Sequence, residues 1–311
     1  MSGASTTTPR RGLGLRDETL GMWLGVLGVA IFALTLPMTR LATGTQEAPQ
    51  LSPWFVTLGR AALAGLLSVA FLVATRSPLP QREHWKPLSM AMLGNAVGYP
   101  LLLAYALRVV SAGHAAVVTA LLPLATAAIA AWVLHQRARL GFWLCAIAGS
   151  ALVVAFSLIR AHQGSASGSF FEWADILLVA AVLAASFGYV YGAQVTPSLG
   201  AERVICWVCV LALPFTLPGA ILLWPRQEVA TSSWLAFVYV GVFSMWMGFF
   251  AWYRGLALGG ALRVSQTQLL QPFLSILAAL PLLGEPIDML TIGFALAVVA
   301  TVVAGKKLSR P

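Results

Sequence analysis

Residues 109–136 read VVSAGHAAVVTALLPLATAAIAAWVLHQ and contain no Asp, Glu, Lys or Arg. A helix needs roughly 20 apolar residues to cross the hydrocarbon core of a bilayer, and this run is longer than that. Outward from it, eight further uncharged runs occupy residues 19–39, 87–107, 140–159, 176–201, 204–225, 229–253, 264–284 and 289–305. A tenth run, at about residues 53–75, is interrupted only by Arg60, whose guanidinium we expect to reach the headgroups from one end of the span. The pattern predicts an all-α integral membrane protein with ten transmembrane helices.

The composition indicates lipid as the solvent of this chain. Of its 311 residues, 59% are hydrophobic and 9% are charged, and the mean hydropathy is +0.85. The net charge of +9 is spread between the apolar runs, which argues against nucleic acid and favours membrane lipid as a partner. With the N-terminus inside, only five of the nineteen basic residues fall outside, at positions 40, 60, 108, 160 and 226. Because Lys and Arg favour the cytoplasmic side, both termini of this multi-pass protein are expected in the cytoplasm.

An internal repeat divides the chain into two halves. A shift of 149 residues aligns residues 104–155 with residues 253–304 without a gap. We therefore expect a disordered cytoplasmic tail at 1–19, five-helix repeats at 20–160 and 172–305, and a second cytoplasmic tail at 306–311. An odd number of spans inverts the second repeat relative to the first. Inverted repeats around a central cavity are typical of transporters that work by alternating access.

The repeat pairs Pro123 with Pro272, each near the middle of its span. Proline removes a helical hydrogen bond and kinks the helix, so we predict gating hinges at both positions. The alternative is that these prolines are simply tolerated, as proline often is in membrane helices.

Polar and aromatic side chains at the midpoints of spans are unfavourable unless they face a cavity or a partner. Asn95 and Ser244 are themselves 149 residues apart, so both halves place a polar group at the same depth. Glutamine amides suit a zwitterion, a sugar or an amide, although they also bind neighbouring helices. The predicted substrate-binding residues are Asn95, Tyr99, Phe187, Tyr191, Ser244, Trp246, Gln268 and Gln271.

Five aromatic residues in the run at 229–253 have a spacing of 4, 3, 4 and 3, namely Tyr239, Phe243, Trp246, Phe250 and Tyr253. In an α-helix this spacing puts all five rings on one face. The stripe either lines a pathway for a ring-bearing substrate or packs against other helices and lipid.

The sequence indicates little ion or redox chemistry within the membrane. No Asp or Glu lies at mid-span, so transport down the substrate's own gradient is the simplest mechanism. His114 is expected at headgroup level, with a proton site as the alternative. Cys206 and Cys209 are expected to pack within a helix, and we expect no metal and no cofactor. The spans contain no catalytic constellation and the loops leave no room for a receptor output domain, so we predict neither an enzyme nor a receptor.

Three motifs carry a family resemblance: Pro-Met-Thr-Arg-Leu-Ala at 37–42, Gly-Arg-Ala-Ala-Leu-Ala-Gly at 59–65 and Leu-Gly-Glu-Pro at 283–286. Over residues 20–305 the chain resembles the EamA-type ten-helix branch of the drug/metabolite transporter superfamily. Its aromatic content is most similar to that of the YddG-type aromatic amino-acid exporters. The first repeat departs from the last motif, with His-Gln-Arg at 135–137 where the second has Gly-Glu-Pro at 284–286.

The resemblance implies a protein of the cell inner membrane that exports neutral or aromatic amino acids, or related metabolites, through a cavity between the halves. We expect a monomer whose partners are a small-molecule substrate and membrane lipid. Efflux of lipophilic cations or drugs is the alternative. For that function an acidic residue is expected in the cavity, and none is visible in the sequence.

Overall fold

The computed structural model describes residues 15–133, 140–164, 173–259 and 264–308. In these ranges the regular structure is helical, apart from an isolated antiparallel bridge between Gly44 and Pro49. The first helix, α1, already begins at Leu15, and the last helix, α15, ends at Leu308. The remainder of both predicted tails lies outside the described residues. The all-α prediction is confirmed for the part of the chain that the structure describes.

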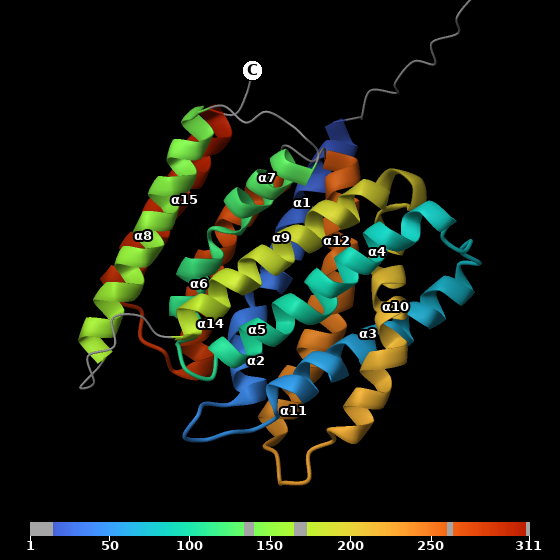
Figure 1. The fold of residues 1–311 in the computed structure, drawn as a ribbon, viewed down its shortest axis with the longest axis horizontal. Helices are drawn as coiled ribbons and strands as arrows, with labels where there is room; N and C mark the ends of the chain where they lie inside the picture. Colours follow the sequence, from blue (N-terminus) through green and yellow to red (C-terminus); the bar gives the residue numbers. More distant parts are fainter. Residues whose placement is uncertain (1–14, 134–139, 165–172, 260–263, 309–311) are drawn as a thin grey trace, which may run out of the picture.

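Long apolar helices, several of them interrupted, form one bundle (Figure 1). Within the described residues, seven helical segments are long and apolar enough to cross a membrane: Asp17–Thr43, Pro53–Ala74, Arg82–Ala106, Ala112–Val133, Trp173–Leu199, Ala201–Leu222 and Thr231–Gly255. Shorter apolar helices, Trp143–Phe156, Thr267–Leu283 and Met289–Thr301, lie where the sequence predicts the remaining three spans.

The helical elements in chain order are α1 (Leu15–Ala33), α2 (Thr35–Thr43), α3 (Pro53–Ala74), η1 (Arg82–His84), α4 (Trp85–Ala91), η2 (Met92–Gly98), α5 (Tyr99–Ala106), α6 (Ala112–Thr119), α7 (Leu122–Val133), α8 (Leu140–Gly164), α9 (Trp173–Leu199), α10 (Ala201–Leu222), α11 (Thr231–Tyr239), η3 (Val240–Met247), α12 (Gly248–Gly259), η4 (Ser265–Leu270), α14 (Gln271–Leu283) and α15 (Met289–Leu308).

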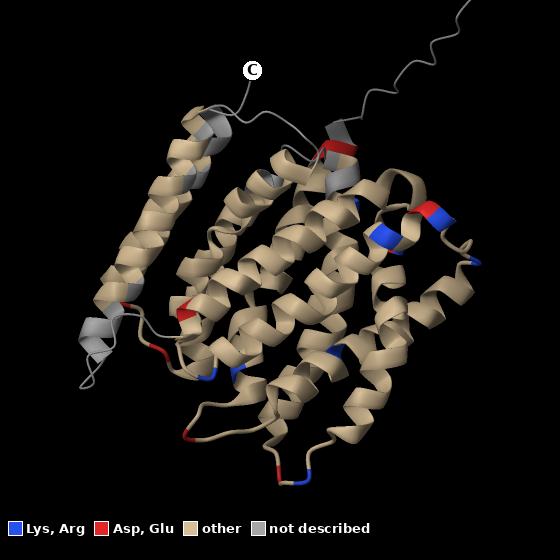
Figure 2. Ribbon diagram, viewed as in Figure 1, with Lys and Arg blue, Asp and Glu red and all other residues tan. Residues whose placement is uncertain are grey.

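The bundle has two ends, which we name by the chain termini. α1 begins and α15 ends at the same end, the upper one in Figure 1, which we call the terminal end. The connections after α2, α10 and α14 lie at the opposite, distal end. Charged residues gather mainly at these two ends and in the connections, while the middles of most helices carry none (Figure 2). α3 packs on α10, α1 packs on α12, and α8 pairs with α15 at one edge.

The first span is broken between α1 and α2, and the second half of the chain stabilises the break. Pro37 lacks an N–H, so the carbonyl four residues earlier, at Ala33, loses its helical partner. The Ser275 hydroxyl of α14 donates to the Ala33 carbonyl at 2.7 Å. The Tyr239 hydroxyl of α11 donates to the Ile31 carbonyl at 3.0 Å. Side chains of the second half thus bond two carbonyls at the break, one of which, that of Ala33, has no backbone donor because of Pro37.

The two halves are irregular at equivalent positions. The π-helical segments η2 and η3 end 149 residues apart, and they contain Asn95 and Ser244. α7 and α14 likewise begin 149 residues apart, at Leu122 and Gln271, each directly after an interruption and each with proline at its second position. π-helical turns are rare and occur mostly at functional sites. The matching interruptions therefore indicate a functional site in the middle of the bundle.

Candidate functional site

Arg60 lies inside the bundle, and the expectation that it reaches the headgroups is wrong. Its side chain is 3% exposed, and its Nη2 donates to Ser244 Oγ at 3.1 Å. Nε and Nη1 have no hydrogen-bond partner in the part of the chain that the structure describes. The side chain turns towards η3, which offers an acceptor, instead of running along α3 to the membrane surface. A cation with unused donors is therefore enclosed by the protein.

A short chain of hydrogen bonds fixes the Arg60 guanidinium. Thr35 Oγ1 and Ser244 Oγ are 2.8 Å apart, and both side chains are buried. Because Ser244 accepts from Arg60, its own hydroxyl hydrogen is free to donate to Thr35. Thr35 is the first residue of α2, directly after the break in the first span. The guanidinium is thus oriented by an interaction that includes both halves of the chain.

Asn95, the sequence counterpart of Ser244, leaves an acceptor unused. Its side chain is 6% exposed, and Oδ1 has no hydrogen-bond partner among the described residues. It packs on Gly188 of α9, where a Cβ would lie 2.3 Å from Asn95 Oδ1. α3 contacts both η2 and η3, so the segments holding Asn95 and Ser244 pack on the helix that carries Arg60.

The π-helix η3 divides the predicted aromatic stripe, so the prediction of one common face is wrong. Tyr239 and Phe243 stack at 5.3 Å, whereas Trp246 and Phe250 form a separate pair at 4.7 Å. Tyr253 is buried in the core with a different ring, that of Phe249. The prediction assumed α-helical spacing, and a π-helical segment shifts the register of the side chains that follow it.

Three rings, those of Phe71, Trp246 and Phe250, form what we call the aromatic triad. Phe71 on α3 meets Trp246 at 6.3 Å and Phe250 at 4.9 Å, both edge-on. Trp246 Nε1 makes no hydrogen bond of ordinary geometry within the described ranges, and the thiol of Cys206 lies within its reach. The triad is thus an apolar surface with one indole N–H that faces a weak acceptor.

A cavity of about 560 Å³ at the terminal end leads to the triad. Phe71 and Phe250 line it together with Arg203 and Arg254, and Arg254 pairs with Glu202 at 3.5 Å. We call this cavity the vestibule. Phe250 follows Ser244 by six residues, roughly 9 Å along a helix. The triad therefore stands between the vestibule and the buried Arg60.

Of the other predicted aromatic residues, Tyr99 lies near Arg60. It is the first residue of α5 and packs with Tyr189 and Val182, and its hydroxyl is within electrostatic reach of the Arg60 guanidinium. Phe187 meets Trp132 edge-on at 6.1 Å, and Trp132 is 69% exposed, so this pair lies towards the periphery. Tyr191 is partly buried against the core that contains the triad. The described contacts do not bring Phe187 to Arg60.

Gln268 and Gln271 meet Pro123 and Pro272 around one small cavity. Here the interruption before α7 faces the interruption before α14. Next to each proline the α-helix is interrupted, whereas the sequence predicts only a kink in a continuous helix. The hinge role of these prolines stays a prediction.

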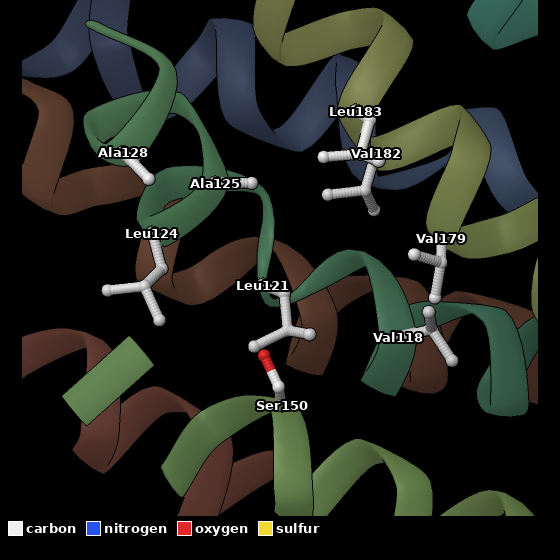
Figure 3. A pocket seen from close by; sticks show the side chains of 9 residues that line it. All are labelled: Val118, Leu121, Leu124, Ala125, Ala128, Ser150, Val179, Val182 and Leu183. Atoms are coloured by element: carbon white, nitrogen blue, oxygen red, sulfur yellow. The ribbon is translucent and has the colours of Figure 1, made fainter. Parts of the chain in front are cut away.

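An apolar groove of about 210 Å³ lies between α6, α7, α8 and α9 (Figure 3). Its lining consists of Val118, Leu121, Leu124, Ala125, Ala128, Ser150, Val179, Val182 and Leu183. Ser150 is the one polar side chain among them, and the predicted substrate-binding residues are absent. Such a lining suits hydrocarbon better than a polar solute.

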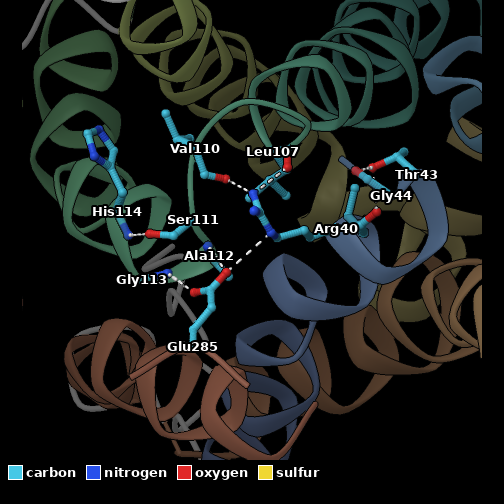
Figure 4. Close-up of polar contacts among 11 residues, drawn as sticks. Arg40, Thr43, Gly44, Leu107, Val110, Ser111, Ala112, Gly113, His114 and Glu285 are labelled. Atoms are coloured by element: carbon cyan, nitrogen blue, oxygen red, sulfur yellow. Dashed lines mark hydrogen bonds and ion pairs between the residues drawn. The ribbon is translucent and has the colours of Figure 1, made fainter. Parts of the chain in front are cut away.

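Glu285 fastens the distal end by several contacts (Figure 4). Gly284 ends α14 in the left-handed conformation, at φ 67°, which glycine adopts without strain. The Glu285 carboxylate then accepts from the backbone N–H of Ala112 at 2.9 Å and of Gly113 at 3.1 Å. It also pairs with Arg40 Nε at 3.3 Å, and Arg40 donates to two backbone carbonyls before α6. We call this set of contacts the distal clasp.

Glu285→Gln is expected to lower the free energy of unfolding by about 1 to 2 kcal/mol, and Glu285→Ala by about 2 to 3 kcal/mol. Glutamine keeps one acceptor for the N-terminus of α6 and loses the ion pair, whereas alanine loses both. Thermal unfolding in detergent measures the difference. Glu47→Gln, an exposed change in a distal connection, is the matched control. Equal melting temperatures for all four proteins would show that the clasp contributes nothing.

His114 is enclosed by protein and does not face headgroups, which corrects its expected surroundings. Its Nε2 lies 2.7 Å from Asp175 Oδ1, and the two residues are 8% and 2% exposed. The pair joins α6 to the first turn of α9, and the His114 ring packs on Phe156 at 5.0 Å. Sequence separation hid this partner, because Asp175 flanks a different span.

Membrane-length helices, interrupted at matching positions around a buried cation, define a multi-pass membrane transporter. The chain belongs to the EamA-like transporter family of the drug/metabolite superfamily, whose model matches residues 19–158 and again residues 172–304. It is 37% identical over 297 residues to the uncharacterized transporter YdeK of Bacillus subtilis (strain 168), covering 94% of this chain and 100% of that protein.

Two further likenesses are more distant. The chain is 23% identical over 270 residues to the WAT1-related protein At3g02690, chloroplastic, of Arabidopsis thaliana, covering 84% of this chain and 65% of that one. A solved crystal structure matches with a TM-score of 0.60 and 21% identity, over 93% of this chain and 97% of its own. At this identity the crystal structure supports the fold alone.

Arg60, Thr35 and Phe71 are the site residues that sequence reasoning missed. The signal for Arg60 was present, as the one charge that interrupts an apolar run. Its distance from the end of the run allowed either an inward or an outward direction. Thr35 and Phe71 carry no signal of their own, since Thr and Phe are ordinary residues of membrane helices.

Proposed function

We propose that this protein is a secondary transporter that exports neutral or aromatic amino acids, or related metabolites, across the cell inner membrane. It is most similar in aromatic content to the YddG-type exporters. Its ten spans form two inverted five-helix halves around a central site, and both termini are cytoplasmic. It works by alternating access, with Pro123 and Pro272 as hinges.

The observation that carries this proposal is that several buried polar atoms in the middle of the bundle lack an ordinary hydrogen bond among the described residues. They are Asn95 Oδ1 in η2, Trp246 Nε1 in η3, and Nε and Nη1 of Arg60, and η2 and η3 end 149 residues apart in the two halves. Buried polar atoms are nearly always paired with protein, water or ligand, so unpaired ones in both halves support a ligand site between them. Rings beside donors and acceptors suit a substrate with an apolar side chain and a polar head.

The state of the two ends agrees with alternating access. At the distal end, Glu285 and Arg40 join α14, α2 and the start of α6, and a separate cavity of about 450 Å³ is lined by the connections after α2 and α10. The vestibule opens at the other end and leads to the triad. This is the arrangement expected of one of the two states of such a transporter, in which the substrate reaches the central site from the terminal end.

A counterflow assay in proteoliposomes tests the function. Liposomes loaded with unlabelled amino acid are expected to take up labelled L-phenylalanine or L-tryptophan transiently above equilibrium. Protein-free liposomes are the control. If several neutral amino acids, including these two, show no exchange while the protein remains folded, the proposed substrate class is wrong.

A further inference from the structure

Among the residues that the structure describes, no carboxylate pairs with Arg60. Its Nε and Nη1 together carry three N–H bonds, and the described residues supply no acceptor for them. Four carboxylates, those of Glu285, Glu83, Asp175 and Glu202, pair with Arg40, His84, His114 and Arg254 respectively. A guanidinium remains charged in proteins, and a buried charge is retained only where a partner compensates it. Ser244 is a neutral partner and compensates it in part.

The neighbours of Arg60 are neutral polar groups. The hydroxyls of Tyr99 and Tyr189 and the thiol of Cys209 are within electrostatic reach of the guanidinium. Because Thr35 and Ser244 fix the orientation of the fork, its unused N–H bonds are held ready for a ligand. Nη2 has a second N–H besides the one donated to Ser244, and on the planar guanidinium it is parallel to an N–H of either Nε or Nη1, so that a carboxylate can accept from both at once.

We propose that Arg60 binds the carboxylate of the substrate, so that the protein takes monocarboxylates with an apolar or aromatic side chain, with or without an α-amino group, and rejects the corresponding amines. This inference rests on the proposed transport function. The aromatic triad receives the side chain, and the free Asn95 Oδ1 accepts from an α-ammonium group when the substrate has one. An amine without a carboxylate meets an uncompensated cation and one neutral acceptor.

Three probes that share a phenyl ring separate the two head groups. L-Phenylalanine carries a carboxylate and an amine, 3-phenylpropionate only the carboxylate, and 2-phenylethylamine only the amine. In proteoliposomes of the full-length protein, both carboxylates are expected to exchange with internal L-phenylalanine. The amine is expected to exchange on the order of 100-fold less efficiently, because it leaves the buried donors unpaired. Exchange of the amine at a comparable rate would overturn the role of Arg60 and leave the proposed transport function standing.

Variants of Arg60 test whether this residue determines the selectivity for carboxylates. Arg60→Gln is expected to reduce exchange of both carboxylates on the order of 100-fold, and Arg60→Lys to lose less, since it keeps the charge without the fork. Arg82→Gln, an exposed change in η1, is the matched control and is expected to exchange like the unmodified protein. Unchanged carboxylate exchange in Arg60→Gln would overturn the inference. If Arg60→Gln does not fold, the three probes on the unmodified protein decide the question.

Absence of exchange for all three probes would refute the proposed function for this class, and melting temperature then decides the inference. A ligand of the folded protein raises its melting temperature. If 3-phenylpropionate stabilises the unmodified protein and 2-phenylethylamine does not, the carboxylate site stands without the transport function. If neither compound stabilises it, the inference is overturned as well.

Discussion

Gly94→Ala is expected to lower the free energy of unfolding by about 3 kcal/mol. A Cβ at Gly94 would lie 2.4 Å from the Ala184 carbonyl oxygen and 2.8 Å from the backbone of Gly188. Neither contact involves a flexible side chain, so η2 and α9 would have to separate. Thermal unfolding in detergent measures the change, and counterflow is expected to fall as well because Asn95 is the next residue.

The control for Gly94→Ala is Gly293→Ala, in α15. A Cβ at Gly293 meets no atom within 4 Å, and alanine has the higher helix propensity. Gly293→Ala is therefore expected to match the unmodified protein or exceed its melting temperature slightly. Equal destabilisation by both changes would mean that backbone contact between η2 and α9 is not the reason why alanine is unfavourable at position 94.

Asp175→Ala is expected to lower the free energy of unfolding by about 3 kcal/mol. The carboxylate lies 2.7 Å from His114 Nε2, and both groups are almost fully enclosed. Removing one member leaves the other buried beside Phe156 without this partner. The expected readout is a lower melting temperature, with loss of the link between α6 and α9 at the distal end.

A double-mutant cycle isolates the pair. His114→Ala and Asp175→Ala, made singly and together, are expected to be strongly non-additive, because the second change removes a group that has already lost its partner. Additive effects would show that each residue acts through other contacts. Asp17→Ala, an exposed change at the start of α1, is the control for the loss of a carboxylate.

The sequence predicted the parts of the fold that depend on composition and length. Uncharged runs identify membrane helices because the hydrocarbon core excludes charge, and this rule needs no knowledge of which helices touch. The 149-residue shift predicted two related halves, and the π-helical segments and the breaks before α7 and α14 recur at that spacing. Spans at 140–159, 264–284 and 289–305 correspond to the three shorter apolar helices.

The candidate site was predicted less completely than the fold, because the sequence does not show in which direction a side chain points. Asn95 and Trp246 were selected for their depth, and both have an unused polar atom in the structure. The position of Arg60 along its span is compatible with a side chain that points to the headgroups, as the sequence predicts, or into the bundle, as the structure has it. The prediction that five rings share one face was wrong because it assumed an α-helical register through η3, which is π-helical.

By itself, the sequence determined that the chain is a helical membrane protein with a repeated half, because hydropathy and spacing act locally along each helix. The tertiary structure alone decided the partners: Ser244 for Arg60, Asp175 for His114, and the N-terminus of α6 for Glu285. These contacts join residues far apart in the chain, and their energies depend on distance and enclosure. The role of a buried charge can be inferred only when the groups around it are known.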